Sequence, residues 1–254
     1  MARLRKSVRI FSFVCTCHGL LLNSRNETIH KHVAINYEKK RNSLKYKCII
    51  FDCDGILVDS EEISNSVLIK MANEVGIEIK MEYALENFAG KSLKNCFAHI
   101  EKRIKKPLPN TFEKEYRNRT FSAFKTDLKP IKGIHDLLNQ ISIPFCVASS
   151  GPIEKIRLNL TTTNLIEKFE NRIFSSYEIG SWKPNPEIFE YAAKKMGFEP
   201  NECAVIEDSL AGVKAGIKGG FDVFGLANHK NKTELKKEGA NVFLGMNELY
   251  ELLN

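Results

Sequence analysis

The chain has 254 residues, of which 43% are hydrophobic and 27% are charged, as is usual for a globular enzyme. No apolar run approaches the roughly 20 residues that a membrane-spanning helix needs, so we expect no membrane partner. The net charge of +7 comes from residues 1–47, which carry eleven Lys and Arg against two Glu, a net +9 that leaves −2 for the rest. This nearly neutral body gives no electrostatic reason to expect a nucleic-acid partner.

Residues 1–46 form a basic extension that differs from the rest of the chain. Its apolar stretch, 10–22, is interrupted by polar residues, and no small-residue cleavage site follows it cleanly. We therefore interpret the segment as a disordered extension or a mis-set start, in preference to a working targeting signal, and expect a cytoplasmic protein. Cys15 and Cys17 are not followed by a second ligand pair at zinc-site spacing, so we expect no zinc site there.

Beyond residue 47, short apolar runs alternate with helical patterns. Cys48–Phe51 is a continuous apolar run that ends in acidic residues, which predicts a buried parallel strand. Further strands are expected at 144–148, 172–174, 203–206, 221–225 and 241–244, with helices from 152, over 186–196 and over 210–218. Repeated units of this length predict an α/β fold with a doubly wound, Rossmann-like parallel sheet. The Cys residues in the strands, Cys48, Cys146 and Cys203, are expected to be buried small hydrophobes of a reducing compartment.

The segment 60–128 interrupts this alternation. Ile63, Val67, Met71 and Val75 recur at helical spacing, and the segment contains no convincing strand. Because it lies between the first and second strands, we interpret it as an inserted helical cap domain. The core domain then consists of residues 47–59 and 129–254.

Four polar clusters follow the predicted strands. In chain order they are Asp52-Cys53-Asp54-Gly55, Ser149-Ser150-Gly151, Lys183-Pro184 and Glu207-Asp208. Ligands of open parallel sheets bind outside the carboxyl ends of the strands, so we expect the four clusters to meet there. Each cluster alone is a common turn or helix-cap sequence, and only their joint order is specific.

The residue types of these clusters suit phosphoryl transfer. Of Asp52 and Asp54, one carboxylate can act as a nucleophile and the other as a general acid and base. Clustered carboxylates repel one another unless a hard cation lies among them, which predicts Mg²⁺ as the cofactor. Lys183 supplies a fixed positive charge, and Ser149 a hydroxyl group for a phosphoryl oxygen.

The same stretches resemble the four motifs of the haloacid dehalogenase superfamily. The resemblance covers residues 46–254 and rests on 51–61, 147–151, 181–189 and 205–213. The position of the cap, between the first two motifs, resembles that in subfamily IA, which includes β-phosphoglucomutase and many sugar-phosphate phosphatases. The stretches around Ser149 and Trp182 are especially similar to bacterial 6-phosphogluconate phosphatases.

The resemblance implies a role for each motif residue. Asp52 would be the nucleophile and a Mg²⁺ ligand, and Asp54 the acid and base, which binds Mg²⁺ through its backbone carbonyl. Asp208 would be a direct ligand, with Glu207 beside it as ligand, water-holder or partner of Lys183. Substrate binding would involve Ser149, Ser150, Lys183 and, at the distal part of the substrate, Lys91 of the cap loop.

The expected reaction is hydrolysis of a small phosphate monoester, such as a sugar or sugar-acid phosphate, through an aspartyl-phosphate. A phosphomutase similar to β-phosphoglucomutase is the first alternative, but residues 60–98 contain no His, and Ser64 falls near the place of the mutase His. A non-catalytic binding or regulatory protein on the same fold is the second. The expected partner is a small phosphorylated metabolite, and the expected state is a monomer or weak homodimer.

Overall fold

The computed structural model of the protein describes residues 44–88 and 92–254. The predicted basic extension lies outside the described residues except for its last three, and so do Cys15, Cys17 and Lys91. The compact unit that the structure describes begins at Leu44. No helix in these ranges is long and apolar enough to cross a membrane.

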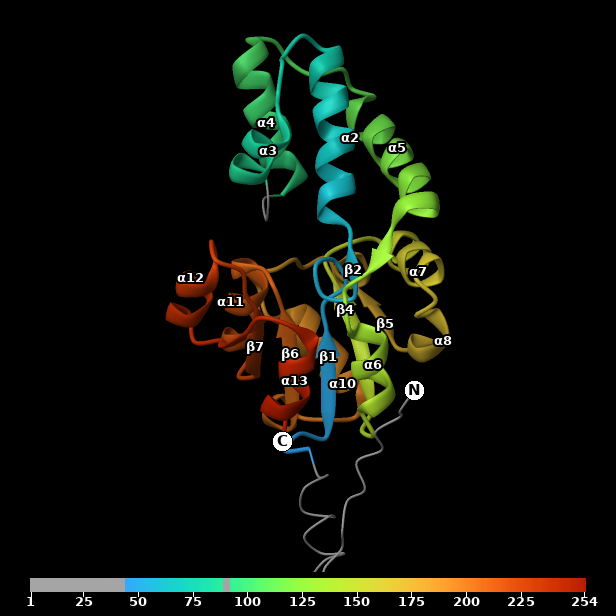
Figure 1. Ribbon diagram of the computed structural model, residues 1–254, viewed down its shortest axis with the longest axis vertical. Coiled ribbons are helices and arrows are strands. Elements are labelled where there is room, and N and C mark those ends of the chain that lie inside the picture. Colours follow the sequence, from blue (N-terminus) through green and yellow to red (C-terminus); the bar gives the residue numbers. More distant parts are fainter. Residues whose placement is uncertain (1–43, 89–91) are drawn as a thin grey trace, which may run out of the picture. The chain divides into compact units, whose positions relative to one another are not determined.

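Six strands form one parallel sheet in the order β5-β4-β1-β6-β7-β8 (Figure 1). Their bounds are β1 Cys48–Phe51, β4 Phe145–Ser149, β5 Ile173–Ser175, β6 Cys203–Glu207, β7 Asp222–Leu226 and β8 Asn241–Phe243. The chain runs outward from β1 through β4 to β5, then crosses to the other side of β1 through β6. This reversal confirms the predicted doubly wound sheet, and it places the ends of β4, β1 and β6 side by side.

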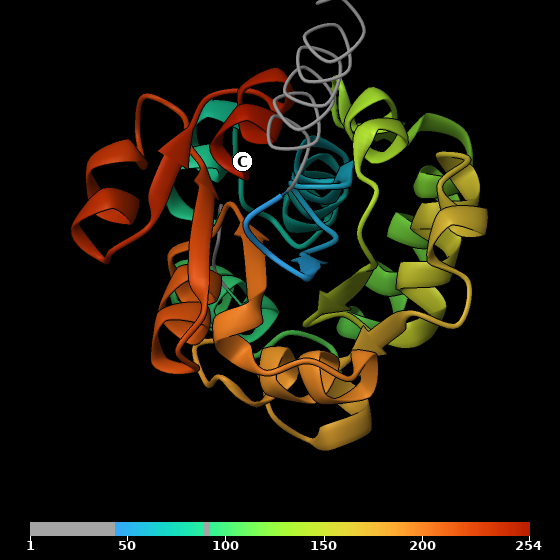
Figure 2. The ribbon, with the colours of Figure 1, turned by 90° about the horizontal axis from the view of Figure 1, so that it is seen from below.

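Helices cover both faces of the sheet, as Figure 2 shows. One face packs against α6 Ile134–Gln140, α7 Ile153–Thr162, α8 Ile166–Phe169 and α13 Met246–Leu252. The other face packs against α10 Glu187–Met196, α11 Leu210–Lys218 and α12 Lys232–Lys237, while α9 Ser176–Ile179 and the short 3₁₀ turn Pro200–Glu202 lie in connections.

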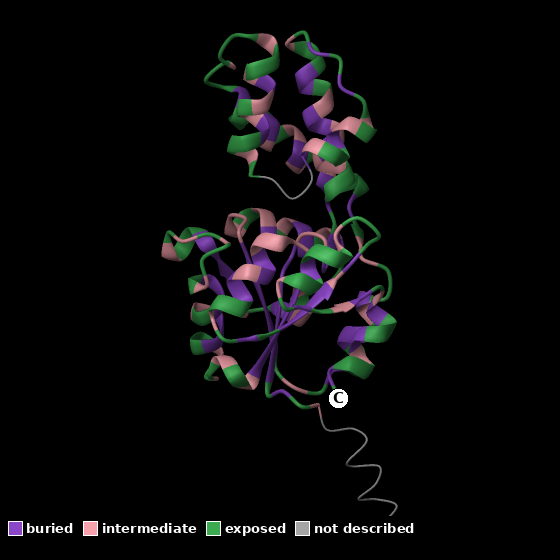
Figure 3. Cartoon of the chain, turned by 90° about the vertical axis from the view of Figure 1, so that its left-hand side faces the viewer, coloured by how far each residue is buried: buried purple, intermediate pink, exposed green. Residues whose placement is uncertain are grey.

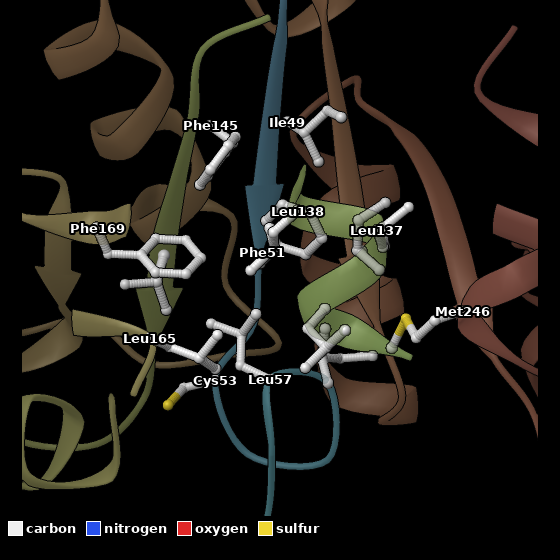
Figure 4. Close-up of a cluster of buried hydrophobic side chains, with 14 of the residues drawn as sticks. Ile49, Phe51, Cys53, Leu57, Leu137, Leu138, Phe145, Leu165, Phe169 and Met246 are labelled. Atoms are coloured by element: carbon white, nitrogen blue, oxygen red, sulfur yellow. The ribbon is translucent and has the colours of Figure 1, made fainter. Parts of the chain in front are cut away.

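Successive side chains of β1 point to opposite faces of the sheet, so β1 contributes to the hydrophobic clusters on both faces. Ile49 and Phe51 join the first hydrophobic cluster, whereas Cys48 and Ile50 join the second. Figure 4 shows Phe51 among the side chains of the first cluster, with the rings of Phe145 and Phe169 edge-on to it. The burial predicted for the strand cysteines is confirmed, since Cys48, Cys146 and Cys203 are all fully buried in the second cluster.

Four helices occupy the segment in which the sequence predicts a cap. They are α2 Glu61–Glu74, α3 Met81–Asn87, α4 Leu93–Ile104 and α5 Phe112–Asp127. They share a hydrophobic cluster of their own, and Figure 3 shows buried residues along them. The chain enters this segment through β2 Val58–Asp59 and leaves it through β3 Lys129–Pro130, which pair antiparallel. The division into core and cap domains at residues 59/60 and 128/129 stays a prediction.

Candidate active site

The carboxyl ends of the central strands open into a cavity of about 450 Å³. Its walls contain the predicted residues Asp52, Asp54, Ser149, Ser150, Lys183, Glu207 and Asp208. Parallel register explains this convergence, because Phe51 pairs with Val147 on one side and with Ile206 on the other. Of the predicted site residues, Lys91 lies outside the described residues.

Asp52 directly follows β1 and is only 7% exposed. Its backbone N–H donates to the carbonyl of Ile206 at 2.9 Å, which ties the residue to β6. Its carboxylate forms an ion pair with the Lys183 ammonium. Burial raises the pKa of Asp52 to about 7 against the attraction of Lys183, because a buried carboxylate lacks solvating water.

Lys183 lies between two buried carboxylates, those of Asp52 and Glu207. The distance from Lys183 Nζ to Glu207 Oε1 is 2.7 Å, and Glu207 is 1% exposed. Burial alone works against the charge of Lys183, but the two carboxylates raise its pKa above its usual range. Of the three roles expected for Glu207, the geometry matches partner of Lys183.

The other carboxylate oxygen of Glu207 is held by the start of α11. It accepts hydrogen bonds from the backbone N–H groups of Asp208 and Ser209 and from the Ser209 hydroxyl, at 2.9–3.0 Å. Gly212 makes room for this arrangement, because a Cβ atom there would lie 1.8 Å from Glu207 Oε1. Both carboxylate oxygens of Glu207 therefore have hydrogen-bond partners within the protein.

Asp54 is held by three side chains that the sequence analysis did not single out. Its carboxylate accepts from Lys155 at 2.7 Å, from Ser60 at 2.6 Å and from Asn159 at 3.3 Å. Although desolvation works against the charged form, the Lys155 ammonium and these hydrogen bonds hold the pKa of Asp54 below its usual value. Asp54 thus points in a fixed direction beside Asp52.

A sequence signal for Lys155 exists. Lys155 is the third residue of α7, and a cation in the first turn of a helix is disfavoured by the helix dipole. Such a lysine close behind the Ser149-Ser150-Gly151 turn suggests a carboxylate partner nearby. The partner follows from the fold, because α7 begins beside the end of β1.

The turn after β4 presents Ser149 and Ser150 to the cavity. Ser149 is buried, and its hydroxyl accepts from the Gly151 N–H at 3.1 Å. The Ser175 hydroxyl donates to the Gly151 carbonyl at 2.7 Å and fixes the turn from β5. The two serines therefore stand at the cavity wall on a braced backbone.

Among the described residues the Asp208 carboxylate has no cationic partner, so the site carries excess negative charge. The cavity wall holds five carboxylates but two ammonium groups, and within residues 44–88 and 92–254 no side-chain hydrogen bond or ion pair reaches the Asp208 carboxylate. Burial, with the charges of Glu207 and Asp52, raises the pKa of Asp208 well above its usual range. In this described part of the chain, no three His, Cys, Asp or Glu side chains are already grouped as a metal-binding set.

Gly55 lets the turn after Asp54 pass close to Asp208. A Cβ atom at Gly55 would lie 2.0 Å from Asp208 Oδ2, and its φ of +83° suits only glycine without strain. The unpaired Asp208 carboxylate is thereby kept near the turn that carries Asp52 and Asp54.

Comparison with known proteins matches residues 49–226 to the family described as haloacid dehalogenase-like hydrolase. The chain is 32% identical over 209 residues to a 6-phosphogluconate phosphatase of Escherichia coli, which covers 82% of this chain and 95% of the relative. It is 25% identical to a phosphorylated carbohydrates phosphatase of Thermotoga maritima, over 82% and 97% of the two chains.

Solved structures of the same family are similar to this chain. A conserved haloacid dehalogenase-like protein of unknown function from Agrobacterium tumefaciens is 30% identical, with a TM-score of 0.74 over 82% of this chain and 97% of that one. A hydrolase of the family from Deinococcus radiodurans with bound phosphate and sodium is 26% identical, with a TM-score of 0.70 over 83% and 96%.

Proposed function

Since this chain belongs to the haloacid dehalogenase-like hydrolases and is a phosphoric monoester hydrolase, we propose that it hydrolyses a sugar or sugar-acid phosphate through an aspartyl-phosphate on Asp52. The observation that carries the proposal is the buried set Asp52–Lys183–Glu207 with Asp54 beside it at one sheet edge. The names of the relatives from E. coli and T. maritima support a phosphorylated carbohydrate as substrate.

In the first step, a carboxylate oxygen of Asp52 attacks the phosphorus atom and the bond to the leaving oxygen breaks. Asp54 protonates that oxygen as it leaves, so the alcohol departs uncharged. A bound phosphate dianion raises the pKa of Asp54 by its negative charge, which opposes Lys155 and lets the carboxyl carry the proton. Lys183 and the Ser149 turn hold the phosphoryl oxygens while they change position.

In the second step, water attacks the phosphorus atom of the aspartyl-phosphate. Asp54, now a carboxylate paired with Lys155, accepts the proton from that water. The bond between phosphorus and the Asp52 oxygen breaks, which releases inorganic phosphate and restores the Asp52 carboxylate. One residue therefore serves as acid and then as base, and its three hydrogen bonds keep it in place for both.

Mg²⁺ fits the donor set of the cavity, because the unpaired Asp208 carboxylate and the excess negative charge call for a hard cation with oxygen ligands. The carboxylates of Asp52 and Asp208 and the backbone carbonyl of Asp54 would hold it. When bound, the ion neutralises charge between the phosphoryl group and the anionic nucleophile. Glu207 forms an ion pair with Lys183 and would hold that lysine in place without binding the ion directly.

Water is the acceptor that the site favours over a second sugar hydroxyl. Ser64 of α2 lines the cavity, and no His stands among the described residues of its wall. A phosphomutase needs a bisphosphate activator, so release of phosphate without one separates the two activities.

The test is a phosphate-release assay of the purified chain with Mg²⁺ over a panel of phosphorylated metabolites. The Asp52→Asn variant should lose at least about 1000-fold in kcat on every substrate, because the amide is a poor nucleophile. Chelation of the metal should abolish activity, and added Mg²⁺ should restore it. The matched control is Asp222→Asn, at the opposite end of the sheet, where Asp222 pairs with Lys45. Unchanged activity of Asp52→Asn would overturn the mechanism.

A further inference from the structure

A second cavity, of about 380 Å³, adjoins the phosphoryl cavity between α5 and the loops of the core. Asp54, Ser64, Ser150, Lys155 and Trp182 belong to the walls of both cavities. Because Asp54 must contact the leaving oxygen, the rest of the leaving group extends past Asp54. The second cavity is therefore where the part of the substrate distal to the phosphate comes to lie.

The wall of this cavity that α5 contributes has polar atoms that the protein satisfies only in part. Thr120 is 3% exposed, and its hydroxyl has the neighbouring Tyr116 hydroxyl beside it but no hydrogen bond of good geometry among the described residues. The Tyr116 hydroxyl, one turn earlier, has a long bond of 3.5 Å to the Ser64 carbonyl. Buried polar groups without partners are rare, and a hydroxyl-bearing ligand would supply the missing hydrogen bonds.

The wall of this cavity that the core contributes has two aromatic side chains. Tyr177 and Trp182 are 50% and 42% exposed, and their rings meet edge-to-face with centroids 5.3 Å apart. Large exposed aromatic side chains on a cavity wall provide a flat apolar surface for the C–H groups of a ligand. Hydroxyls on one wall and aromatic rings on the other suit a polyhydroxylated carbon chain.

Arg117 of α5 supplies a cation whose present partner, Glu113, lies at the surface. Its Nε and Nη2 donate to one Glu113 oxygen at 2.9 and 2.7 Å, and Nη2 also reaches the Tyr177 hydroxyl at 3.4 Å. Among described residues, Nη1 has no partner. The pair is 32% and 53% exposed, and such surface pairs contribute little, so Glu113 is easily displaced. A guanidinium binds a carboxylate through two parallel hydrogen bonds.

We propose that the second cavity is the binding site for the distal end of the substrate and that Arg117 there binds a carboxylate. The preferred substrate is then an open-chain polyhydroxy acid phosphorylated at the end opposite its carboxylate. This assignment rests on the proposed phosphatase function. It narrows the sugar or sugar-acid phosphates proposed there to the acids and names the residue that selects them.

The test compares two substrates that differ at a single carbon. Gluconate 6-phosphate carries a carboxylate where glucitol 6-phosphate carries a hydroxymethyl group, and the rest of the chain is the same. The wild-type chain should show a kcat/KM at least about 10-fold higher for the acid, since a hydrogen-bonded charge is expected to contribute a factor of about 10 to 100. Arg117→Met should bring the ratio of the two kcat/KM values close to one, mainly through a higher KM for the acid.

Arg119→Met is the matched control. Arg119 lies on the same helix and pairs with Glu74 and Glu115, but it is not part of either cavity wall. Its removal should leave the ratio unchanged. Because the ratio is measured within one variant, partial unfolding does not affect it.

The outcomes separate this assignment from the proposed function. Equal kcat/KM values for the two substrates in the wild type, or an Arg117→Met variant that keeps the preference, would overturn the assignment while phosphate release still supports the phosphatase. Absence of phosphate release from both substrates and from p-nitrophenyl phosphate would overturn the proposed function itself.

Discussion

The two cavities of the site are built on opposite principles. In the phosphoryl cavity, Lys183 and Glu207 are almost wholly buried, joined to each other, and held by strand ends and backbone N–H groups. In the distal cavity, Arg117 is half-buried with an exposed partner, and the hydroxyl of Thr120 has no hydrogen bond of good geometry among described residues.

This difference separates chemistry from selection. A reacting group must be held in one geometry before the substrate arrives, whereas a recognition group gains by keeping its hydrogen-bonding capacity for the ligand. Changes in the phosphoryl cavity should therefore lower kcat on every substrate or lower the stability of the fold. Changes in the distal cavity should alter the choice among substrates.

The largest effect is expected for Lys183→Met. This change removes the cation beside the phosphoryl group and should lower kcat by about 1000-fold on every substrate. It also leaves Asp52 and Glu207 buried without their partner, at a cost of about 3–5 kcal/mol in the free energy of unfolding. Urea unfolding and phosphate release measure the two effects. Lys214→Met, which breaks a 3.9 Å surface contact with Glu238, is the control, and a Lys183→Met variant within tenfold of wild type would contradict the account.

Gly212→Ala should destabilise the fold by about 1–3 kcal/mol, as overpacking does. The sign is informative, because Ala in place of a helical Gly is ordinarily stabilising. Here the new methyl group would enter the space of the Glu207 carboxylate. Gly245→Ala is the control, since it meets only the flexible end of the Asn247 side chain. Thermal unfolding that shows equal or higher stability for Gly212→Ala would mean that Glu207 is not held as described.

Lys155→Met should have an effect that depends on the leaving group. Without Lys155, the pKa of Asp54 rises, so the carboxyl still carries a proton, but Asp54 loses the 2.7 Å partner that aims it at the leaving oxygen. We expect kcat/KM to fall about 10- to 100-fold for sugar phosphates, and distinctly less for p-nitrophenyl phosphate, whose leaving group needs no proton. Lys168→Met, at an exposed lysine bound to Asn139, is the control. Equal losses on both substrates would argue against a role for Lys155 in positioning Asp54.

Thr120→Val should give the smallest effect and leave stability intact. The Thr120 hydroxyl has no hydrogen bond of good geometry within the described chain and interacts there with the Tyr116 hydroxyl, so its removal takes little from the fold. We expect KM to rise about 3- to 10-fold for a polyhydroxylated substrate, with little change in kcat. Thr126→Val, at an exposed position of α5, is the comparison. A fall in stability with an unchanged KM would assign Thr120 to packing instead.

The sequence is sufficient to predict the sheet and the residues at its edge. Strands β1 and β6 are buried on both faces, and residues 48–51 and 203–206 read as continuous apolar runs. Parallel pairing then brings their ends together, so Asp52, Ser149 and Glu207 converge without knowledge of side-chain positions. The roles of these residues, the cytoplasmic location and the oligomeric state stay predictions.

The remaining parts depend on packing that local pattern does not encode. The pair β2–β3 has two residues in each strand, too few for a period to show. Arg117 looks like an ordinary charge on a solvated helix face, and its position at the distal cavity follows from how α5 docks. The place of Lys155 in the first turn of α7 is a sequence signal, but its partner Asp54 follows only from how α7 docks. Helical periodicity predicts which face is apolar, but not which helix or loop lies opposite the polar one.

The most direct measurement of the central claim is capture of the phosphorylated enzyme. The chain is mixed with Mg²⁺ and a sugar phosphate that it hydrolyses, and the reaction is quenched in acid within the first turnover. The protein is then digested and its peptides are sequenced by tandem mass spectrometry. The account predicts a phosphoryl group on Asp52 that is absent from Asp52→Asn. With p-nitrophenyl phosphate, whose leaving group needs no proton, the phosphoryl group should accumulate in Asp54→Asn, where water is no longer activated. Phosphate release at the wild-type rate by Asp52→Asn, or a phosphoryl group on another residue, would contradict it.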